Sequence, residues 1–134
     1  QFFTIPTQSN ATDFGDLTQA RRNLTSASSS TRGLFMGGDF QTSSYYDIID
    51  FITIQSTGNA QDFGNLTVAR AEPGAVASTL RACVGGGYVS PSTPQTNVID
   101  YITIASTGNA TDFGDLTVAR RQVRGCSNGH GGLG

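Results

Sequence analysis

The sequence predicts an all-β fold made of repeated antiparallel units about 50 residues long. The stretch NATDFGDLT occurs twice letter for letter, at residues 10–18 and 109–117, and a near copy, NAQDFGNLT, occupies residues 59–67. The asparagines that open these copies are 49 and 50 residues apart. Between the copies, short runs of β-branched and aromatic residues alternate with turns of Gly, Ser and Asn, a pattern typical of strands rather than helices.

Each unit has room for four short strands. Residues 97–106 are apolar on both alternate faces, which indicates a strand buried on two sides. The Gly108-Asn109 pair after it is typical of a tight hairpin, and a last strand is expected at about residues 110–117. Two earlier strands are expected, one of them ending in a glycine pair. A four-stranded sheet packed between two like sheets is the arrangement of a β-propeller blade, and it explains the missing polar face.

We expect a single repeat domain over residues 1–134, containing about 2.7 units. Because three units are fewer than the four to eight blades of a typical propeller, we expect self-association into a six-bladed dimer or a head-to-tail fibre. Edge pairing between residues 2–5 of one copy and 130–134 of another would join the chains. The expected boundaries are residues 1–24 for the third and fourth strands of a first unit, 25–73 and 74–123 for two complete units, and 124–134 for the start of a further unit.

Composition excludes several classes of partner. All eight basic residues are Arg and the net charge is −2, so no basic tract is present and nucleic acid is not an expected partner. The apolar runs are far shorter than a membrane span, which predicts a soluble chain without membrane insertion. Cys83 and Cys126 fall at different phases of the repeat, so we expect two free, structural thiols.

Charged residues recur at fixed phases of the repeat. Arg21, Arg70 and Arg120 stand at one phase, and Asp16 and Asp115 stand at another. We expect these five residues to form structural ion pairs between units. The alternative is that the arginines line a central channel that binds anions.

No residues with the spacing of a catalytic or metal centre are found. Oxygen atoms of Asn10, Asp13 and Asp16 could bind calcium, but the spacing of a calcium loop is absent, which favours hydrogen bonding in turns and at strand edges. His130 is the only histidine and stands among glycines, without partners for a metal site or a catalytic triad. We therefore expect no metal, no cofactor and no enzymatic activity, with a propeller enzyme fragment as the weaker alternative.

The units differ most in the segments after their glycine pairs, residues 39–48 and 88–99. Loops held by a rigid scaffold commonly carry recognition, and adjacent tyrosines can stack on a sugar or a peptide. The alternative is that these segments are turns that tolerate variation without a function. The candidate binding residues are Ser43, Ser44, Tyr45, Tyr46, Ser90, Ser92 and Gln95.

The units also resemble a known repeat family. A glycine pair that closes one strand, an aromatic residue on the next (Phe51, Tyr101), another on the fourth, and an Arg beyond it resemble the kelch repeat over nearly the whole chain. The chain departs from that pattern because it has no Trp, which kelch repeats usually carry on the fourth strand. The aromatic residues on the fourth strand are Phe14, Phe63 and Phe113.

The stretch IDYITIASTGNATDFGDLTVAR, residues 99–120, resembles certain kelch-like arrays more closely than it resembles the general kelch pattern. These arrays occur in tail-fibre and other structural proteins of marine bacteriophages, including those that infect cyanobacteria. That resemblance implies a non-enzymatic virion or extracellular protein that presents variable loops to a host. Its partners would then be copies of itself and a host cell-surface glycan. A carbohydrate-binding propeller lectin is the alternative.

Overall fold

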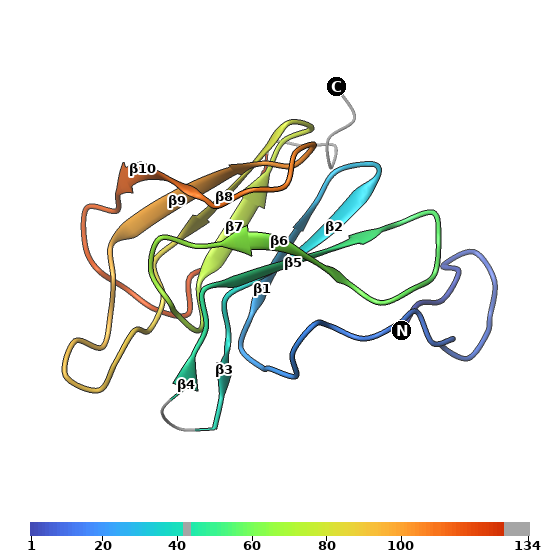
Figure 1. Ribbon diagram of the computed structural model, residues 1–134, viewed down its shortest axis with the longest axis horizontal. Helices are drawn as coiled ribbons and strands as arrows, with labels where there is room; N and C mark the ends of the chain where they lie inside the picture. Colours follow the sequence, from blue (N-terminus) through green and yellow to red (C-terminus); the bar gives the residue numbers. More distant parts are fainter. Residues whose placement is uncertain (42–43, 128–134) are drawn as a thin grey trace.

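The computed structural model describes residues 1–41 and 44–127, which form antiparallel sheets without any helix (Figure 1). The prediction of an all-β, antiparallel chain is therefore confirmed. The first sheet contains, in spatial order, β1 (Thr25–Ser28), β2 (Arg32–Met36), β5 (Ile48–Thr53) and β6 (Gln61–Asn65). The second contains β7 (Gly74–Ala77), β8 (Arg81–Gly85), β9 (Val98–Thr103) and β10 (Thr111–Asp115). A small ribbon pairs β3 (Asp39–Phe40) with β4 (Ser44–Tyr45).

The two sheets share an irregularity because they are built from the same motif. Pairing of the last two strands skips Phe63 in β6 and Phe113 in β10. The residue after each bulge is a glycine, with φ of +144° at Gly64 and +136° at Gly114. Residues with a side chain are strained in this region, so the backbone of the bulge requires glycine. The repeated Phe-Gly pair therefore has a local structural cause.

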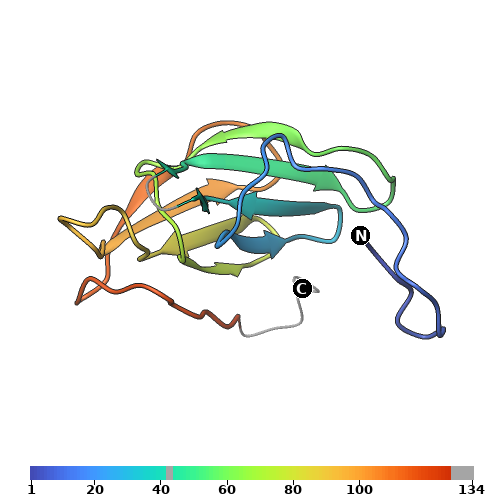
Figure 2. The ribbon, with the colours of Figure 1, turned by 90° about the horizontal axis from the view of Figure 1, so that it is seen from below.

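The N-terminal segment, residues 1–24, repeats the pairing of these strands in reduced form. Its Phe2↔Thr12 bridge matches the Phe51↔Gln61 pair of the first sheet and the Tyr101↔Thr111 pair of the second. The segment projects from one side of the molecule, whereas β10 lies on the opposite side (Figures 1 and 2).

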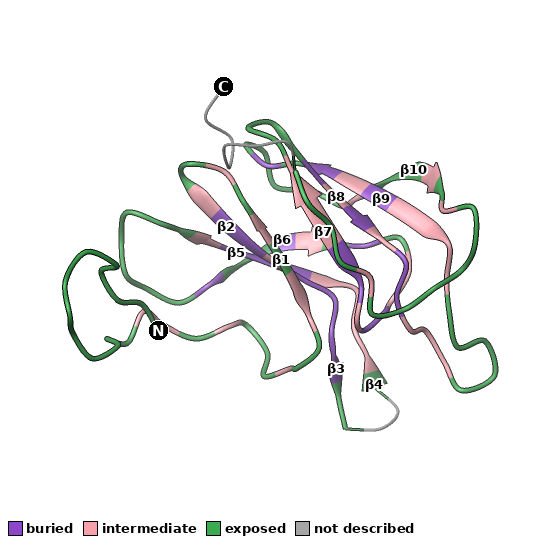
Figure 3. Ribbon diagram, turned by 180° about the vertical axis from the view of Figure 1, so that it is seen from behind, coloured by how far each residue is buried: buried purple, intermediate pink, exposed green. Residues whose placement is uncertain are grey.

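One hydrophobic core lies between the facing sheets, as the buried strand segments show (Figure 3). The first sheet supplies larger side chains than the second, and the two sets interlock. The first set is Leu34, Met36, Ile49, Phe51, Phe63 and Leu66, and the second is Ala82, Val84, Ile102 and Ile104.

The outer faces of the two sheets are less covered than the sequence suggests. Residues 97–106 were expected to be buried on both faces, yet only the side of Ile102 and Ile104 is fully buried. Ile99 and Tyr101 on the other face are half-buried. The reason is that within the described residues only one sheet packs against β9, on its inner side.

The two thiols are free, as expected, with Cys83 half-buried and Cys126 exposed. Burial raises the pKa of the Cys83 thiol, an effect that the nearby Arg81 partly opposes.

Two isoleucines on opposite faces of β9 test which side holds the core. Ile102→Ala should lower the free energy of unfolding by about 2–5 kcal/mol, because it leaves a cavity between the sheets. Ile99→Ala should cost less than half as much in dilute solution, because its side chain already contacts water. Urea denaturation measures both, and equal losses would contradict a core confined to the inner face.

Candidate functional site

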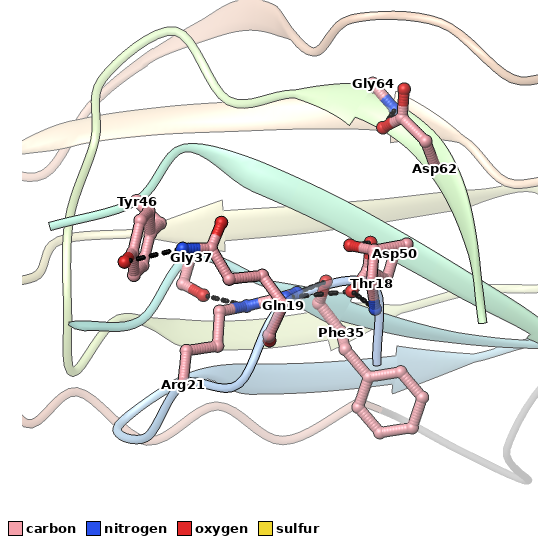
Figure 4. A network of polar contacts seen from close by, with 9 residues as sticks. All are labelled: Thr18, Gln19, Arg21, Phe35, Gly37, Tyr46, Asp50, Asp62 and Gly64. Atoms are coloured by element: carbon pink, nitrogen blue, oxygen red, sulfur yellow. Dashed lines mark hydrogen bonds and ion pairs between the residues drawn. The ribbon is translucent and has the colours of Figure 1, made fainter. Parts of the chain in front are cut away.

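The end of the N-terminal segment, residues 18–24, forms a linker into β1, and a buried polar cluster anchors this linker to the first sheet. Arg21 Nη1 lies 2.8 Å from Asp50 Oδ2, and both side chains are fully buried. Thr18 donates to the same carboxylate through its backbone N–H (3.2 Å) and its Oγ1 hydroxyl (2.6 Å). Figure 4 shows the side chains of Arg21 and Thr18 converging on Asp50. One carboxylate of β5 thus fixes the linker that enters the sheet.

The same cluster recurs one unit later. Arg70 Nη2 forms a buried ion pair with Asp100 on β9, and Thr67 donates to that carboxylate through its N–H (3.1 Å) and Oγ1 (2.6 Å). Arg70 Nη1 also donates to the carbonyl of Val98 (2.8 Å). Burial lowers the pKa of Arg70, whereas Asp100 opposes this effect by stabilising the charged form.

Two of the three expected arginines, Arg21 and Arg70, form ion pairs between units, but the expected carboxylates were wrong. The partners are Asp50 and Asp100, in place of Asp16 and Asp115, which make no ion pair within the described residues. The third arginine, Arg120, is exposed and has no ion pair in that part of the chain. Both paired guanidinium groups are fully buried, so neither can bind an anion from solution.

A second contact between units joins a turn to a strand. The N–H groups of Gly58 and Ala60 donate to the carbonyls of Phe14 and Asp16, each at 2.8 Å. Asn59 Oδ1 accepts a hydrogen bond from the N–H of Asp16 at 3.0 Å. The turn thereby meets residues 14–16 of the preceding unit, which correspond to its expected fourth strand, through three hydrogen bonds.

The two sheets are joined by the same three bonds, which we call the turn joint. Gly108 and Ala110 donate to the carbonyls of Phe63 (2.7 Å) and Asn65 (2.8 Å), and Asn109 Oδ1 accepts from the N–H of Asn65 (3.0 Å). The Asn-Ala parts of the second and third motifs dock backward, on the Phe-Gly-Asp part of the first motif and the Phe-Gly-Asn part of the second.

Local bonds use the remaining oxygen atoms of the motif. Asp13, Asp62 and Asp112 each accept a hydrogen bond from the N–H of the glycine two residues later, at 3.3, 3.1 and 3.0 Å. These contacts are the hydrogen bonds of turns and strand edges that the sequence favoured over calcium ligands. Among residues 1–41 and 44–127, no group of three or more His, Cys, Asp or Glu side chains is arranged to hold a metal ion.

The variable loops of the two sheets meet at one end of the molecule. The rings of Tyr45 on β4 and Tyr88 after β8 lie 5.4 Å apart, centre to centre, and the Arg121 guanidinium stands 5.2 Å above the Tyr88 ring. Desolvation and the adjacent Tyr88 raise the pKa of Tyr45 above its ordinary value of 10.0. We call Tyr45, Tyr88 and Arg121 the tyrosine cluster.

The sequence singled out one of these residues and missed two. Tyr88 had a signal, since it is the first residue of a segment that differs between units. Arg121 had no signal in the sequence, because only the packing of the segment after β10 places its guanidinium over the Tyr88 ring. Tyr46, another candidate, accepts a hydrogen bond from Gln19 Nε2 at 2.7 Å and so contacts the linker (Figure 4).

The other candidate binding residues are scattered. The hydroxyl groups of Ser90 and Ser92 form a hydrogen bond at 3.2 Å. Ser90 Oγ also accepts a hydrogen bond from the N–H of Thr93 at 3.0 Å, which closes a local turn. Ser44 and Gln95 are exposed. Ser43 and His130 lie outside the described residues.

An apolar cavity of about 450 Å³ lies between the N-terminal segment and the outer face of the first sheet. Phe2 and Phe14 line it from the segment, and Phe35, Ile52 and Ile54 line it from the sheet. Among the residues that line it, Asp16 is the one ionisable side chain.

No protein-family model matches the chain, and no curated protein matches it. The described residues also contain no helix that is long and apolar enough to cross a membrane.

Two arginines at the same phase of the repeat test the buried cluster. Arg70→Met should lower the free energy of unfolding by about 3–5 kcal/mol, because Asp100 would keep a buried charge without its partner. Arg120→Met is the matched control and should change it by less than about 0.5 kcal/mol, because that side chain is exposed. Similar losses for both variants in chemical denaturation would contradict the assignment.

Two glycines with nearly equal φ test the turn joint. A Cβ at Gly64 would overlap the carbonyl oxygen of Gly108, whereas at Gly114 it would meet no atom within 4 Å. Gly114→Ala should cost about 1–3 kcal/mol from backbone strain alone. Gly64→Ala should cost about 1–3 kcal/mol more, because the turn must also move. Thermal denaturation of the two variants gives the difference, which would vanish if the turn did not dock.

Proposed function

We propose that this chain is a non-enzymatic structural and adhesive protein, built from kelch-like propeller blades, that belongs to a virion appendage of the tail-fibre kind. The observation that carries the proposal is a division of roles between residues. Where two units adjoin within the chain, the recurrent polar residues are occupied in the joint between them, whereas the segments that differ meet on one end. Such a chain builds a scaffold and presents loops on it.

The arrangement of the first strands supports blades around a common axis. β1 lies beside β7, and Val123 and Gly125 in turn lie against Gly74 and Val76, so the first strands of successive units are neighbours. The sheets themselves pack face to face. In a propeller, likewise, the first strand of each blade stands nearest the axis and the sheets stack around it.

The proposed ligand of the loops is a glycan on a host cell surface. Sugars present apolar C–H faces that pack on aromatic rings, and hydroxyl groups that accept hydrogen bonds from a guanidinium. The tyrosine cluster offers both kinds of group at the junction of two units. A lectin with one equal pocket per unit is less well supported, because residues 39–48 and 88–99 differ in length and sequence.

Self-association is part of the proposal, either as a six-bladed dimer or as a head-to-tail fibre. The cavity beside the N-terminal segment supports it. That cavity lies where the first two strands of an N-terminal blade would stand, and it leaves apolar side chains of the first sheet uncovered. Pairing of residues 2–5 with residues 130–134 of another copy would fill this place, although the latter lie outside the described residues.

Binding of the labelled protein to a glycan array tests the proposed function. The wild-type chain should bind a subset of glycans, and Tyr88→Ala should weaken that binding about tenfold or more through loss of its ring. Leu80→Ala is the control, because Leu80 is exposed in the turn at the opposite end of β8. Absence of any bound glycan, or equal binding by both variants, would contradict a recognition role for the tyrosine cluster.

A further inference from the structure

The segment that receives a turn occurs three times in the chain, at residues 13–16, in β6 and in β10, and the third copy is open. A Cβ at Gly15 or Gly64 would overlap the backbone of the docked turn, but at Gly114 it would meet nothing within 4 Å. The phenylalanine before the glycine is covered where a turn is docked and uncovered where none is. Phe63, before Gly64, is 3% exposed, whereas Phe113, before Gly114, is 60% exposed. The edge of β10 therefore repeats the receiving side of the turn joint, but no turn is docked on it.

The turn also exists three times, and its first copy is open. Residues 58–60 and 108–110 are docked within the chain, whereas residues 9–11, which occupy the same phase, are exposed. Asn10 and Ala11 match Asn59 and Ala60, and Ser9 keeps the N–H that Gly58 uses. This turn can make the same three hydrogen bonds.

Apolar side chains beside the open turn show the same pattern. Phe3 and Ile5 stand at the phase of Ile102 and Ile104, which are buried in the core between the sheets. In the N-terminal segment they are instead 63% and 87% exposed.

We propose that the turn of residues 8–11 in one copy docks on β10 of a second copy, in a head-to-tail contact between identical chains. Ser9 and Ala11 donate their N–H groups to the carbonyls of Phe113 and Asp115, and Asn10 Oδ1 accepts from the N–H of Asp115. Phe3 and Ile5 of the first copy then cover Phe113 of the second. This inference specifies the interface of the self-association proposed above and rests on it.

The occupant is a second copy because both halves of the contact belong to this chain and the joint is one the chain already forms twice. The two halves lie on opposite sides of the molecule, so a chain cannot join its own ends in the described arrangement (Figures 1 and 2). A head-to-tail contact repeats until it closes as a ring or continues as a fibre.

One part of the internal joint is absent from this contact. Gln1 stands at the phase of Asp50 and Asp100, so Arg120 meets an amide in place of a carboxylate. The contact between copies keeps the backbone hydrogen bonds and the apolar cover but lacks the ion pair. It is therefore weaker and more reversible than the joints inside the chain.

Sedimentation and light scattering of the 134-residue chain test the interface. The wild-type chain should assemble above its monomer mass of 14.0 kDa at micromolar concentration. Ile5→Asp should raise Kd at least a hundredfold by placing a charge in the apolar contact. Phe40→Asp is the matched control and should leave Kd unchanged, because Phe40 is 46% exposed and stands on the β3–β4 ribbon, apart from the turn of residues 8–11 and from β10 (Figure 1).

The amide of the turn provides a second matched pair. Asn10→Ala should raise Kd about fivefold through loss of one hydrogen bond, with the folding stability of the chain unchanged. Asn109→Ala removes the equivalent bond inside the chain, so it should lower folding stability and leave Kd unchanged.

A mixing experiment distinguishes this contact from any other. Chains with Ile5→Asp retain an intact β10, and chains with Phe113→Asp retain an intact turn. Each alone should stay monomeric, and the mixture should form a 1:1 complex through the one remaining contact. A wild-type monomer would overturn both the self-association and this inference. Assembly that survives Ile5→Asp and Phe113→Asp would overturn the interface alone and leave self-association standing.

Discussion

The buried pair of an arginine with an aspartate from the next unit is the interaction on which the rest of the structure depends. Removing either partner of a buried guanidinium–carboxylate pair leaves an uncompensated charge away from water, which is strongly destabilising. Because Arg21 and Asp50, or Arg70 and Asp100, belong to different units, neither unit can satisfy its own charge. The pair thus fixes the linker, the linker places one sheet against the next, and the hydrophobic core forms between them.

In this repeat, the same kind of contact that holds neighbouring units together inside the chain is also available for contacts between chains. Each motif carries a turn that docks backward and a strand that receives the following turn, so every internal unit is held on both sides. Repeat proteins owe most of their stability to such contacts between neighbours. At the N-terminal turn and at β10 the same groups stand open, and unpaired strand edges favour association. The chemistry that orders the units therefore also offers contacts for other chains.

The recurrent and the variable residues serve different ends of the molecule. Thr, Arg, Asn and Gly of the repeat lie in joints and bulges, where their geometry leaves little room for substitution. The variable segments follow β2 and β8 and meet where the two sheets adjoin, which brings Tyr45 and Tyr88 together from separate units. A recognition surface at such a junction can change its side chains without disturbing the scaffold, as is common for loops on rigid folds.

The amino-acid sequence alone was enough to predict the 49- and 50-residue period, the all-β class and the approximate places of β9 and β10, because these depend on local composition and spacing. It did not predict the ribbon of β3 and β4, which lies in a segment that differs between units. The sequence did single out Arg21 and Arg70, since recurrence at one phase is visible in a single chain. Only the tertiary structure decided their partners. Asp16 is nearer to Arg21 in sequence than Asp50 is, but the linker turns its guanidinium into the next sheet, where the carboxylate of β5 points inward. The contacts of Tyr45 with Tyr88, and of each turn with the strand before it, likewise join residues more than 40 positions apart. Such contacts depend on how one sheet packs on another, which no local pattern of residues encodes.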